Sequence, residues 1–394
     1  MWAFGLTKDK IDEILKIPLE KRLPSKGIEK LEVPLPLIRD NEVLVKVKSS
    51  ALNYNSIWSS LCHPLTPKQL VSSYIQRNPN VNDHLKDYFI FGSDASGVIE
   101  HVGKNVRDWS KGDEVIIHCN IVNEFDNVIQ NDGMLSDSQS IWGYETNYGS
   151  FAEYTKVRSS QLIKKPKEIS WELASSFSLT LSTAYRMLVS NNGAMIKAGD
   201  TCLIWGGAGG LGSFAVQLAK LSGAKVIAIV SSDEKKEICY NLGADFVFNR
   251  KDEFPDKFVD KSGNPDYLAW KKVKNIIKKQ GIESIDIVFE HVGRDTLGLS
   301  TYLVNRGGKV IICAATSGYL STLDLRFLWM QLKTIIGSHF ANYNEACLAA
   351  NLIFTNQVKP LIHSINDINN LPLMMDKMHS NQTYGKIVFN HNCN

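Results

Sequence analysis

The sequence lacks the features that would assign it to several specialised classes of protein. No run of apolar residues approaches the roughly 20 that a membrane-spanning helix needs. The first residues, MWAFGLTKDK, contain no basic region followed by a long apolar run, as a secretory signal peptide would. The formal net charge of +3 is too small to indicate binding to nucleic acid or to a membrane surface. We therefore expect a soluble, cytoplasmic protein.

Metal-binding and disulfide patterns are also missing. The seven cysteines are scattered, and none forms C-x-x-C, so a structural zinc site is not expected. Several lie in apolar segments such as TCLIW and VIICAA, where a cysteine packs as a small core residue. An odd number of cysteines without a spacing pattern is typical of a reducing compartment.

The first third of the chain has the pattern of a β-rich domain. Its 394 residues and ordinary composition, 44% apolar and 22% charged, suit a globular protein of two domains. Residues 31–50 contain the alternating run VLVKVKS, which predicts a half-exposed strand. GSDASGVIEHVG and WSKGDEVIIHC then combine strand-like runs with turns, and residues 64–86 predict a polar, helical excursion.

A repeating pattern of strand, turn and helix begins after Ile169. The run SWELASSFSLTLSTAYRML predicts a helix with a serine N-cap. Short apolar strands then alternate with helices: TCLIWG, KVIAIVS, DFVFN, IDIVFEHV, GKVIICAA and TIIGSHF. This alternation predicts a parallel sheet covered on both faces, the doubly wound fold that binds nucleotides. We place this domain at residues 171–340, and we expect residues 341–394 to return to the first domain, residues 1–170.

The turn after the strand TCLIW carries a glycine pattern typical of a dinucleotide site. Gly207, Gly209 and Gly212 form G-x-G-x-x-G, and the loop also contains Gly210 and Leu211. The pattern follows a strand and opens a helix that precedes a second strand, which is the context such a site requires. Glycines let the backbone approach a pyrophosphate, and the helix N-terminus adds donors and positive potential. The alternative is a tight turn without a ligand.

The end of the second strand indicates which nicotinamide cofactor is bound. An NAD site has Asp or Glu there to hold the ribose 2′-hydroxyl. Here Ser231 and Ser232 occupy this place, and Lys235 and Lys236 follow. Hydroxyls and cations suit the 2′-phosphate of NADPH, whereas Asp233 suits the first turn of a helix. A solvated helix face is the alternative for the lysines.

Longer segments resemble a known superfamily. FGSDASGVIEHVGKNVRDWSKGDEVI, followed by YGSFAEY and the glycine loop, resembles the medium-chain dehydrogenases/reductases. The resemblance implies a GroES-like catalytic domain in addition to the Rossmann domain. Zinc-dependent alcohol dehydrogenases of this superfamily have a metal-binding His in a G-H-E motif, but this chain has GSD at Gly92 to Asp94 and lacks the matching cysteines. We therefore expect no metal, as in the zinc-free reductases of activated carbon–carbon double bonds.

Five segments narrow the resemblance to one branch. ALNYNSIW, IWGYETNYGSFAEY, LTLSTAYRML, VFEHVG and DLRFLWMQLKTIIGSHFAN together resemble the crotonyl-CoA carboxylase/reductases, which reductively carboxylate enoyl-CoA thioesters. WGYETN and GSHFAN distinguish this branch from plain enoyl and quinone reductases. The resemblance implies that Thr183 contributes to cofactor binding and that Arg326, in DLRFLW, grips the phosphates of CoA.

The same resemblance gives a role to Glu145, a carboxylate among the aromatic residues of WGYETNYGSFAEY. In the family a carbon dioxide molecule is held by an Asn, by the backbone of an aromatic residue, and by a Glu and a His that share a water. The corresponding residues are Asn55, Tyr144, Glu145 and His339, and the NYN motif leaves Asn53 as a second choice for the amide. Carbon dioxide has no net charge, so fixed dipoles of this kind suit it. A structural Glu–His pair is the alternative.

One helix adds a cluster of cations. AWKKVKNIIKK predicts apolar residues on one face, Trp270, Val273 and Ile277, and lysines on another, Lys271, Lys274 and Lys278. A solvated lysine face is the default interpretation of such a run, and docking of the CoA phosphates is the sharper one.

The resemblance therefore implies an NADPH-dependent reductive carboxylation. Hydride adds to the β-carbon of an enoyl-CoA, and the α-carbon of the resulting enolate attacks carbon dioxide to give an alkylmalonyl-CoA. Positioning and the exclusion of water carry the main path. An acyl carrier protein could replace CoA, and family members assemble as homotetramers. Two alternatives are a reductase of enoyl thioesters that does not carboxylate and a cofactor-binding protein that has lost its chemistry.

Overall fold

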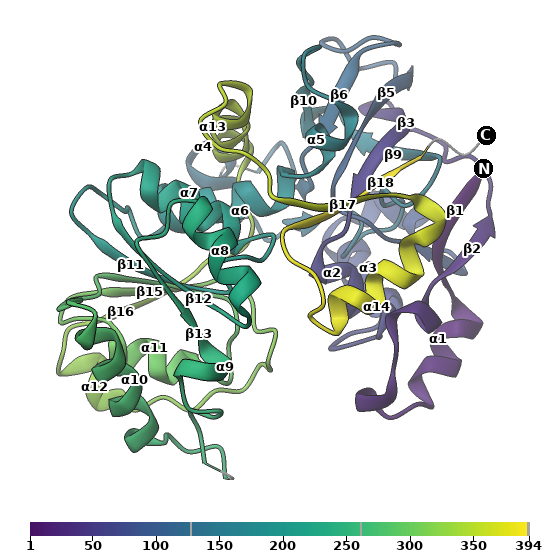
Figure 1. Ribbon diagram of the computed structural model, residues 1–394. Helices are drawn as coiled ribbons and strands as arrows, with labels where there is room; N and C mark the ends of the chain where they lie inside the picture. Colours follow the sequence, from purple (N-terminus) through teal and green to yellow (C-terminus); the bar gives the residue numbers. More distant parts are fainter. Residues whose placement is uncertain (127, 261, 392–394) are drawn as a thin grey trace. The chain divides into compact units, whose positions relative to one another are not determined.

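The computed structural model describes residues 1–126, 128–260 and 262–391. The chain forms two compact units (Figure 1). Unit 1 comprises Met1–Leu179, Asn342–Thr355 and Pro360–Asn394, and unit 2 comprises Thr180–Ala341 and Asn356–Lys359. The first part of the chain and its C-terminal part therefore belong to the same unit.

Unit 1 is built mainly on antiparallel strands. Its largest sheet has seven strands in the order β10-β6-β5-β3-β18-β17, with β9 paired to β3, and smaller sheets have the orders β2-β1-β4 and β7-β8. The C-terminal β18 pairs antiparallel with β3, so the end of the chain completes a sheet that the first third begins (Figure 1). The strands are β1 (Trp2–Thr7), β2 (Glu29–Glu32), β3 (Glu42–Ala51), β4 (Tyr88–Ile90), β5 (Ala95–Val102), β6 (Glu114–Ile117), β7 (Asn120–Ile121), β8 (Ser140–Ile141), β9 (Tyr154–Arg158), β10 (Leu162–Lys164), β17 (Ile362–Asp367) and β18 (Lys386–Asn390).

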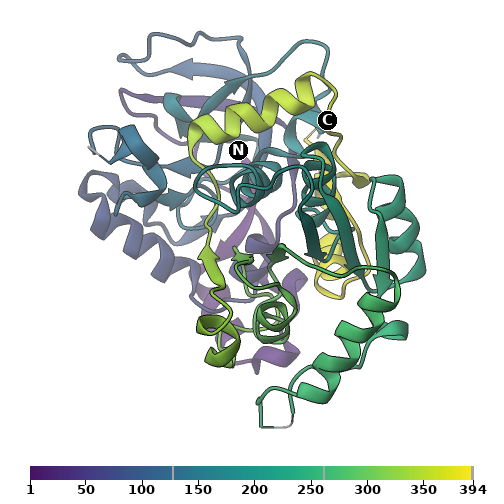
Figure 2. The same cartoon turned by 90° about the vertical axis from the view of Figure 1, so that its left-hand side faces the viewer.

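The helices of unit 1 cover these sheets. They are α1 (Lys8–Leu15), α2 (Tyr54–Ser60), α3 (Pro67–Arg77), α4 (Ile129–Asp132), α5 (Trp171–Ser175), α13 (Tyr343–Phe354) and α14 (Leu371–His379). α13 is the yellow-green helix in the upper part of Figure 2 and belongs to unit 1. The hydroxyl of Tyr343 in its first turn donates to the carbonyl of Leu162 over 2.7 Å. The core contains Leu52, Ile57 and Phe389, so apolar residues from both ends of the chain pack together.

Unit 2 contains the predicted doubly wound fold. All neighbours in its six-stranded sheet pair in parallel, in the order β13-β12-β11-β14-β15-β16. The strands are β11 (Thr201–Trp205), β12 (Lys225–Val230), β13 (Phe246–Asn249), β14 (Ile287–Glu290), β15 (Lys309–Ile312) and β16 (Thr334–Gly337). The strand order reverses at β11, and ligands of such sheets bind beyond the carboxyl ends of the strands at this point. The predicted fold class is confirmed.

Helices lie on both faces of the parallel sheet, with α7 and α8 on one side and α10, α11 and α12 on the other (Figure 1). Their bounds are α6 (Ser178–Leu188), α7 (Gly212–Leu221), α8 (Asp233–Asn241), α9 (Arg250–Glu253), α10 (Tyr267–Lys279), α11 (Leu297–Leu303) and α12 (Leu325–Trp329). On α10 the residues Trp270, Val273 and Ile277 are buried, as the apolar pattern predicts.

The single helix expected after Ser170 is divided into α5 and α6. Ser170 is the N-cap, and its hydroxyl accepts from the N–H of Leu173 at 3.2 Å, as predicted. The helix is interrupted where Ser176 donates to the carbonyl of Leu173 and Ser178 donates to the carbonyl of Ile117. Serine hydroxyls compete with helical hydrogen bonds in this way, which the apolar periodicity does not reveal.

Candidate active site

The glycine loop joins β11 to α7, and its glycines are required for different physical reasons. A Cβ on Gly212 would lie 2.2 Å from the carbonyl oxygen of Gly206, and a Cβ on Gly207 would lie 2.8 Å from the Cβ of Ala228 on β12. These two positions exclude a side chain so that helix and strand can pack closely. Among the described residues, a Cβ on Gly209 would meet only the Gly206 oxygen, at 3.2 Å. Packing therefore does not require Gly209, and its missing side chain leaves room above the loop.

The loop also presents the N-terminus of α7. Gly209, Gly210 and Leu211 are half-exposed, and Leu211, the N-cap residue, makes no side-chain capping hydrogen bond. The first N–H groups of a helix have no partners within the helix, so an anion placed there gains donors and a favourable dipole. The residues present therefore fit the pyrophosphate of a dinucleotide.

The residues expected at the 2′-phosphate lie at the carboxyl end of β12. Ser232 is the N-cap of α8 and accepts from the N–H of Lys235 at 3.4 Å. Ser231 and Lys235 are half-buried, whereas Asp233 is exposed in the first turn of α8, as expected. Lys236 is used elsewhere, because its Nζ lies 2.9 Å from Oε1 of Glu253. The role of Lys235 at the 2′-phosphate stays a prediction.

Two cations near Lys235 were missed in the sequence. Burial lowers the pKa of Lys235, Glu234 opposes this shift, and the positive charges of Lys251 and Arg250 lower it further. Arg250 and Lys251 follow β13, and parallel strands end at the same edge of a sheet. Their position directly after DFVFN was the signal that could have revealed them. Arg250 and Lys251 are therefore further candidates for holding a phosphate beside Lys235.

In unit 1, Asn55 lies in the first turn of α2 and contacts the GSD segment. Its Nδ2 donates to the hydroxyl of Ser93 at 2.9 Å. Asn53 is buried and engaged differently, since its Nδ2 donates to Asp94 at 2.8 Å and its Oδ1 accepts from Lys386. The amide of Asn53 thus belongs to a buried network, whereas Asn55 is half-exposed. The geometry favours Asn55 as the amide that meets a ligand.

Backbone contacts bring the segment WGYETN to the same place. The N–H of Gly92 donates to the carbonyl of Gly143 at 3.2 Å. Gly143 must be glycine, because its φ is +69° and a Cβ there would lie 1.8 Å from the carbonyl oxygen of Gly92. The ring of Tyr144 lies 6.5 Å from that of Trp58, which is on α2 with Asn55. The structure therefore brings helix α2, which carries Asn55, and the segment that carries Tyr144 to the same GSD segment.

Glu145 has two partners within unit 1. Its Oε2 accepts from the N–H of Ile141 at 2.8 Å, and its Oε1 lies 3.4 Å from Nη2 of Arg77. Arg77 also donates to Ser140 at 3.1 Å, so it holds the loop that carries Glu145. Arg77 lies at the end of α3, in a stretch that the sequence presented only as a polar excursion. The side chain of Glu145 is 17% exposed, so it can meet a further ligand.

The remaining predicted residues belong to unit 2. His339 is exposed in the loop after β16, and Thr183 is buried on α6. Arg326 is exposed on α12 and forms an ion pair of 2.7 Å with Asp324, a contact that lowers the pKa of this carboxyl. The pairing of Glu145 with His339 stays a prediction.

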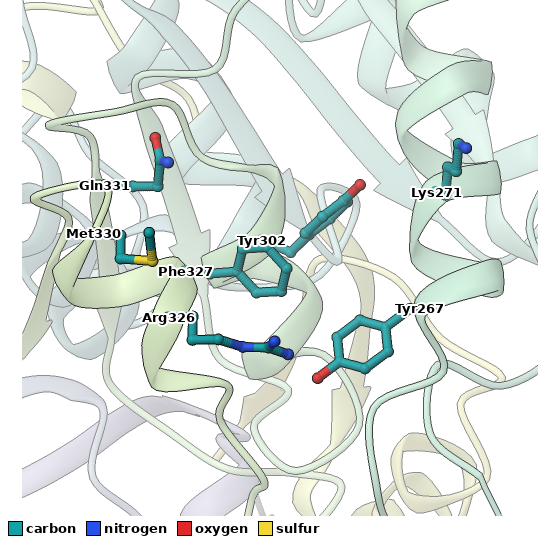
Figure 3. Close-up of a pocket in the computed structure, with 7 residues that line it drawn as sticks. All are labelled: Tyr267, Lys271, Tyr302, Arg326, Phe327, Met330 and Gln331. Carbon is teal, nitrogen blue, oxygen red and sulfur yellow. The ribbon is translucent and has the colours of Figure 1, made fainter.

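Arg326 lines a cavity of about 600 Å³ (Figure 3). The residues around it combine two cations with three aromatic rings: Tyr267, Lys271, Tyr302, Arg326, Phe327, Met330 and Gln331. The hydroxyl of Tyr267 donates to Asp324 at 2.6 Å, so Tyr267 and Arg326 are held by the same carboxylate. Aromatic faces with adjacent cations suit a nucleotide.

The segment Gly92 to Asp94 does not fit a metal. Asp94 is fully buried, and its Oδ2 lies 2.9 Å from Nζ of the buried Lys386. Its Oδ1 accepts from the N–H of Leu179 at 2.8 Å. An ammonium group therefore already neutralises this carboxylate and would repel a second cation. In the part of the chain that the structure describes, no group of three or more His, Cys, Asp or Glu side chains is arranged to hold a metal ion.

Among the described residues, no helix is both long enough and apolar enough to cross a membrane.

Comparison with protein-family models supports the domain types of both units. Residues 39–167 match the alcohol dehydrogenase GroES-like domain, and residues 210–354 match the family described as zinc-binding dehydrogenase. The second name describes the family as a whole; in this chain the segment Gly92 to Asp94 does not fit a metal, because Asp94 is paired with Lys386.

Comparison with individual proteins narrows the assignment. The chain is 42% identical to a crotonyl-CoA reductase of Streptomyces collinus, over 98% of this chain and 86% of that protein. It is 39% identical to a crotonyl-CoA carboxylase/reductase of Cereibacter sphaeroides, over 91% and 82% of the two chains. The structure of the 2-octenoyl-CoA carboxylase reductase CinF, solved with NADP and 2-octenoyl-CoA, is similar with a TM-score of 0.93 and 37% identity, covering 99% of this chain and 87% of the other. The chain therefore belongs to the crotonyl-CoA carboxylase/reductase family of the medium-chain dehydrogenase/reductase superfamily.

Proposed function

We propose that this protein reductively carboxylates an enoyl-CoA, crotonyl-CoA or a longer homologue, to an alkylmalonyl-CoA with NADPH and carbon dioxide. The observation that carries the proposal is that the GSD segment contacts both Asn55, through Ser93, and the segment that carries Tyr144 and Glu145, through Gly92 and Gly143. These contacts occur in a chain that belongs to a family of carboxylating reductases. In the proposal, residues 1–170 with 341–394 form the domain that carries Asn55, Tyr144 and Glu145, and residues 171–340 bind the cofactor and carry His339.

NADPH, when bound at the glycine loop, supplies the hydride for the β-carbon. The chain contributes the open surface at Gly209 and the N-terminus of α7, where Leu211 provides no side-chain cap, for the pyrophosphate. Ser231, Ser232 and Lys235 hold the 2′-phosphate, and Arg250 and Lys251 add positive charge near Lys235. Thr183 on α6 completes the proposed cofactor site.

Asn55 and the backbone of Tyr144 would hold carbon dioxide beside the α-carbon of the enolate. The Asn55 amide has a second N–H in addition to the one that it donates to Ser93. The N–H of Tyr144 donates to the carbonyl of Ile141 over 3.3 Å, a long bond that can be shared with a second acceptor. Two fixed donors would orient the neutral ligand at little cost in reorganisation.

Glu145 and His339 would complete the site through a shared water. An ionised carboxylate offers about four lone-pair positions, and the contacts with Ile141 and Arg77 leave positions for a water. Excluding other solvent matters, because a proton delivered to the enolate gives the saturated acyl-CoA instead of the carboxylated product.

The cavity beside Arg326 is the proposed docking place for the CoA nucleotide. Lys271 and Arg326 supply positive charge for phosphates, and the rings of Tyr267 and Tyr302 supply flat apolar faces for adenine. The face of α10 that was ambiguous in the sequence thus contributes Lys271 to this cavity (Figure 3). A CoA thioester is favoured over an acyl carrier protein because the aromatic rings and cations that line the cavity suit an adenine nucleotide, which only CoA carries.

A homo-oligomer, with the tetramer of the family as the expectation, is part of the proposal. β16 is an edge strand of the parallel sheet, and large apolar side chains are exposed close to it in sequence, including Trp329 and Leu332, both 66% exposed. Exposed edges and apolar patches of this kind commonly pair with another chain. Light scattering would measure the state. Six cysteines are free in the described part of the chain, which suits the cytoplasm.

The test is an assay of NADPH oxidation with crotonyl-CoA, with and without bicarbonate and carbonic anhydrase, followed by mass spectrometry of the product. The wild-type protein should form ethylmalonyl-CoA. Asn55→Leu, Glu145→Ala and His339→Asn should retain a substantial rate of NADPH oxidation and shift the product toward butyryl-CoA. A loss of roughly 1.4 to 2.7 kcal/mol of carbon dioxide positioning corresponds to a ten- to a hundredfold change in partition.

Two outcomes would contradict the proposal. The absence of a carboxylated product from the wild-type protein at saturating bicarbonate would leave a plain enoyl-thioester reductase. An equal loss of hydride transfer and carboxylation in the three variants would mean that Glu145 and His339 serve the fold or the substrate.

A further inference from the structure

We propose that Ser93 is a positioning residue for carboxylation, which orients the Asn55 amide toward carbon dioxide. The inference rests on the proposed function of Asn55 and adds a residue to it. The hydroxyl of Ser93 accepts from Nδ2 of Asn55 at 2.9 Å. This side chain lies between the N-terminus of α2 and the start of β5, and it is fully buried.

The hydrogen bond decides which way the amide faces. An Asn side chain has two N–H donors in one plane, and its last torsion is otherwise broad. With one N–H directed at Ser93, the plane and the direction of the second N–H are set before a ligand arrives. The hydroxyl of Ser56, 3.5 Å from Oδ1 of Asn55, lies on the oxygen side of the amide and supports the same orientation. Preorganised donors act without reorganisation during the reaction.

Ser93 is itself held on both sides. Before it, Gly92 donates to Gly143 and accepts from the N–H of Ser150 at 3.0 Å. After it, Asp94 forms the buried ion pair with Lys386. The backbone on either side of Ser93 is therefore held by contacts that do not involve Asn55. A serine that served only packing would not need a hydrogen bond to the half-exposed amide of Asn55.

The test is the ratio of alkylmalonyl-CoA to saturated acyl-CoA at fixed bicarbonate, together with the rate of NADPH oxidation. Ser93→Ala should lower the ratio about tenfold and change the oxidation rate less than about twofold. Ser96→Ala is the matched control. Ser96 is equally buried and its hydroxyl donates to the carbonyl of Trp171 at 2.7 Å, but that bond does not involve the amide. The control should leave the ratio unchanged.

A double variant separates positioning from packing. In an Asn55→Leu background, Ser93→Ala should change the ratio less than about twofold, because Ser93 acts only through the amide. Ser93→Cys provides a second variant should the alanine form fail to fold. It is similar in size but a weak acceptor, so the ratio should fall in the same direction.

The outcomes are distinguishable from those of the proposed function. A wild-type ratio of zero overturns the proposed function and this inference with it. If Asn55→Leu lowers the ratio while Ser93→Ala and Ser93→Cys leave it unchanged, the proposed function stands and the role of Ser93 is wrong. Additive effects in the double variant would also overturn the inference.

Discussion

The two units form their candidate sites in opposite ways. In unit 2 the dinucleotide loop depends on side chains that are absent, since Gly207 and Gly212 let helix and strand meet and Gly209 leaves room for a ligand. In unit 1 the proposed carboxylation cluster depends on polar side chains that are present, and these lie next to a buried polar network. Its anchor is the ion pair of Asp94 and Lys386, which are 292 residues apart in the chain. The first site should fail when an atom is added, and the second when an atom is removed.

The largest effect is expected from removing the anchor of unit 1. Lys386→Met leaves the carboxylate of Asp94 buried without its counter-charge, which typically costs about 3 to 5 kcal/mol. Denaturant unfolding would measure the loss. Lys111→Met is the control, because Lys111 pairs at 2.6 Å with Glu100 on the surface. An exposed pair contributes about 0 to 1 kcal/mol. Equal losses of unfolding free energy in the two variants would mean that the buried pair contributes no more to stability than a surface pair.

Adding one methyl group to the loop of unit 2 should separate folding from binding. Gly212→Ala places a Cβ 2.2 Å from a backbone oxygen and should destabilise the protein. Gly209→Ala meets its nearest neighbour at 3.2 Å, so stability should change by less than about 1 kcal/mol. NADPH affinity should nevertheless fall about tenfold or more, because the methyl group occupies the place of the pyrophosphate. Thermal unfolding and fluorescence titration would measure the two quantities. Unchanged affinity in Gly209→Ala would place the phosphates elsewhere.

The same difference explains how much could be predicted from the sequence. The six strands, the glycine loop and the N-cap at Ser170 are local patterns, and the structure confirms the fold that they indicate. The partners of the polar residues in unit 1 are not local. Nothing near Glu145 indicates Arg77, and nothing near Asp94 indicates Lys386, because only the folded chain brings them together. The prediction of one continuous helix after Ser170 was wrong for a related reason, because the hydroxyl contacts of Ser176 and Ser178 interrupt a helix that the apolar periodicity favours.

Cofactor preference measures whether side chains, and not only glycines, determine binding in unit 2. Wild-type protein should prefer NADPH over NADH by at least tenfold in kcat/KM, or about 1.4 kcal/mol. Lys235→Ala should reduce this preference by raising the KM for NADPH while leaving NADH nearly unaffected. Lys236→Ala lies on the same helix but is paired with Glu253, so it should keep the preference. Equal efficiency of the wild-type protein with both cofactors would contradict the assignment.

The smallest change in product ratio is expected from a substitution of Arg77. It tests whether the Glu145 carboxylate itself controls carboxylation. Arg77 lies 3.4 Å from the Glu145 carboxylate, and their side chains are 35% and 17% exposed. Such partly solvated pairs contribute about 0 to 1 kcal/mol. Arg77→Met should therefore shift the product ratio by no more than about fivefold, less than Glu145→Ala, because the N–H of Ile141 still holds the carboxylate. The shift should shrink as salt rises, since exposed charges are screened. Lys68→Met, an exposed change on the same helix, should have no effect. If Arg77→Met shifts the product as strongly as Glu145→Ala, the loop position rather than the carboxylate itself controls carboxylation.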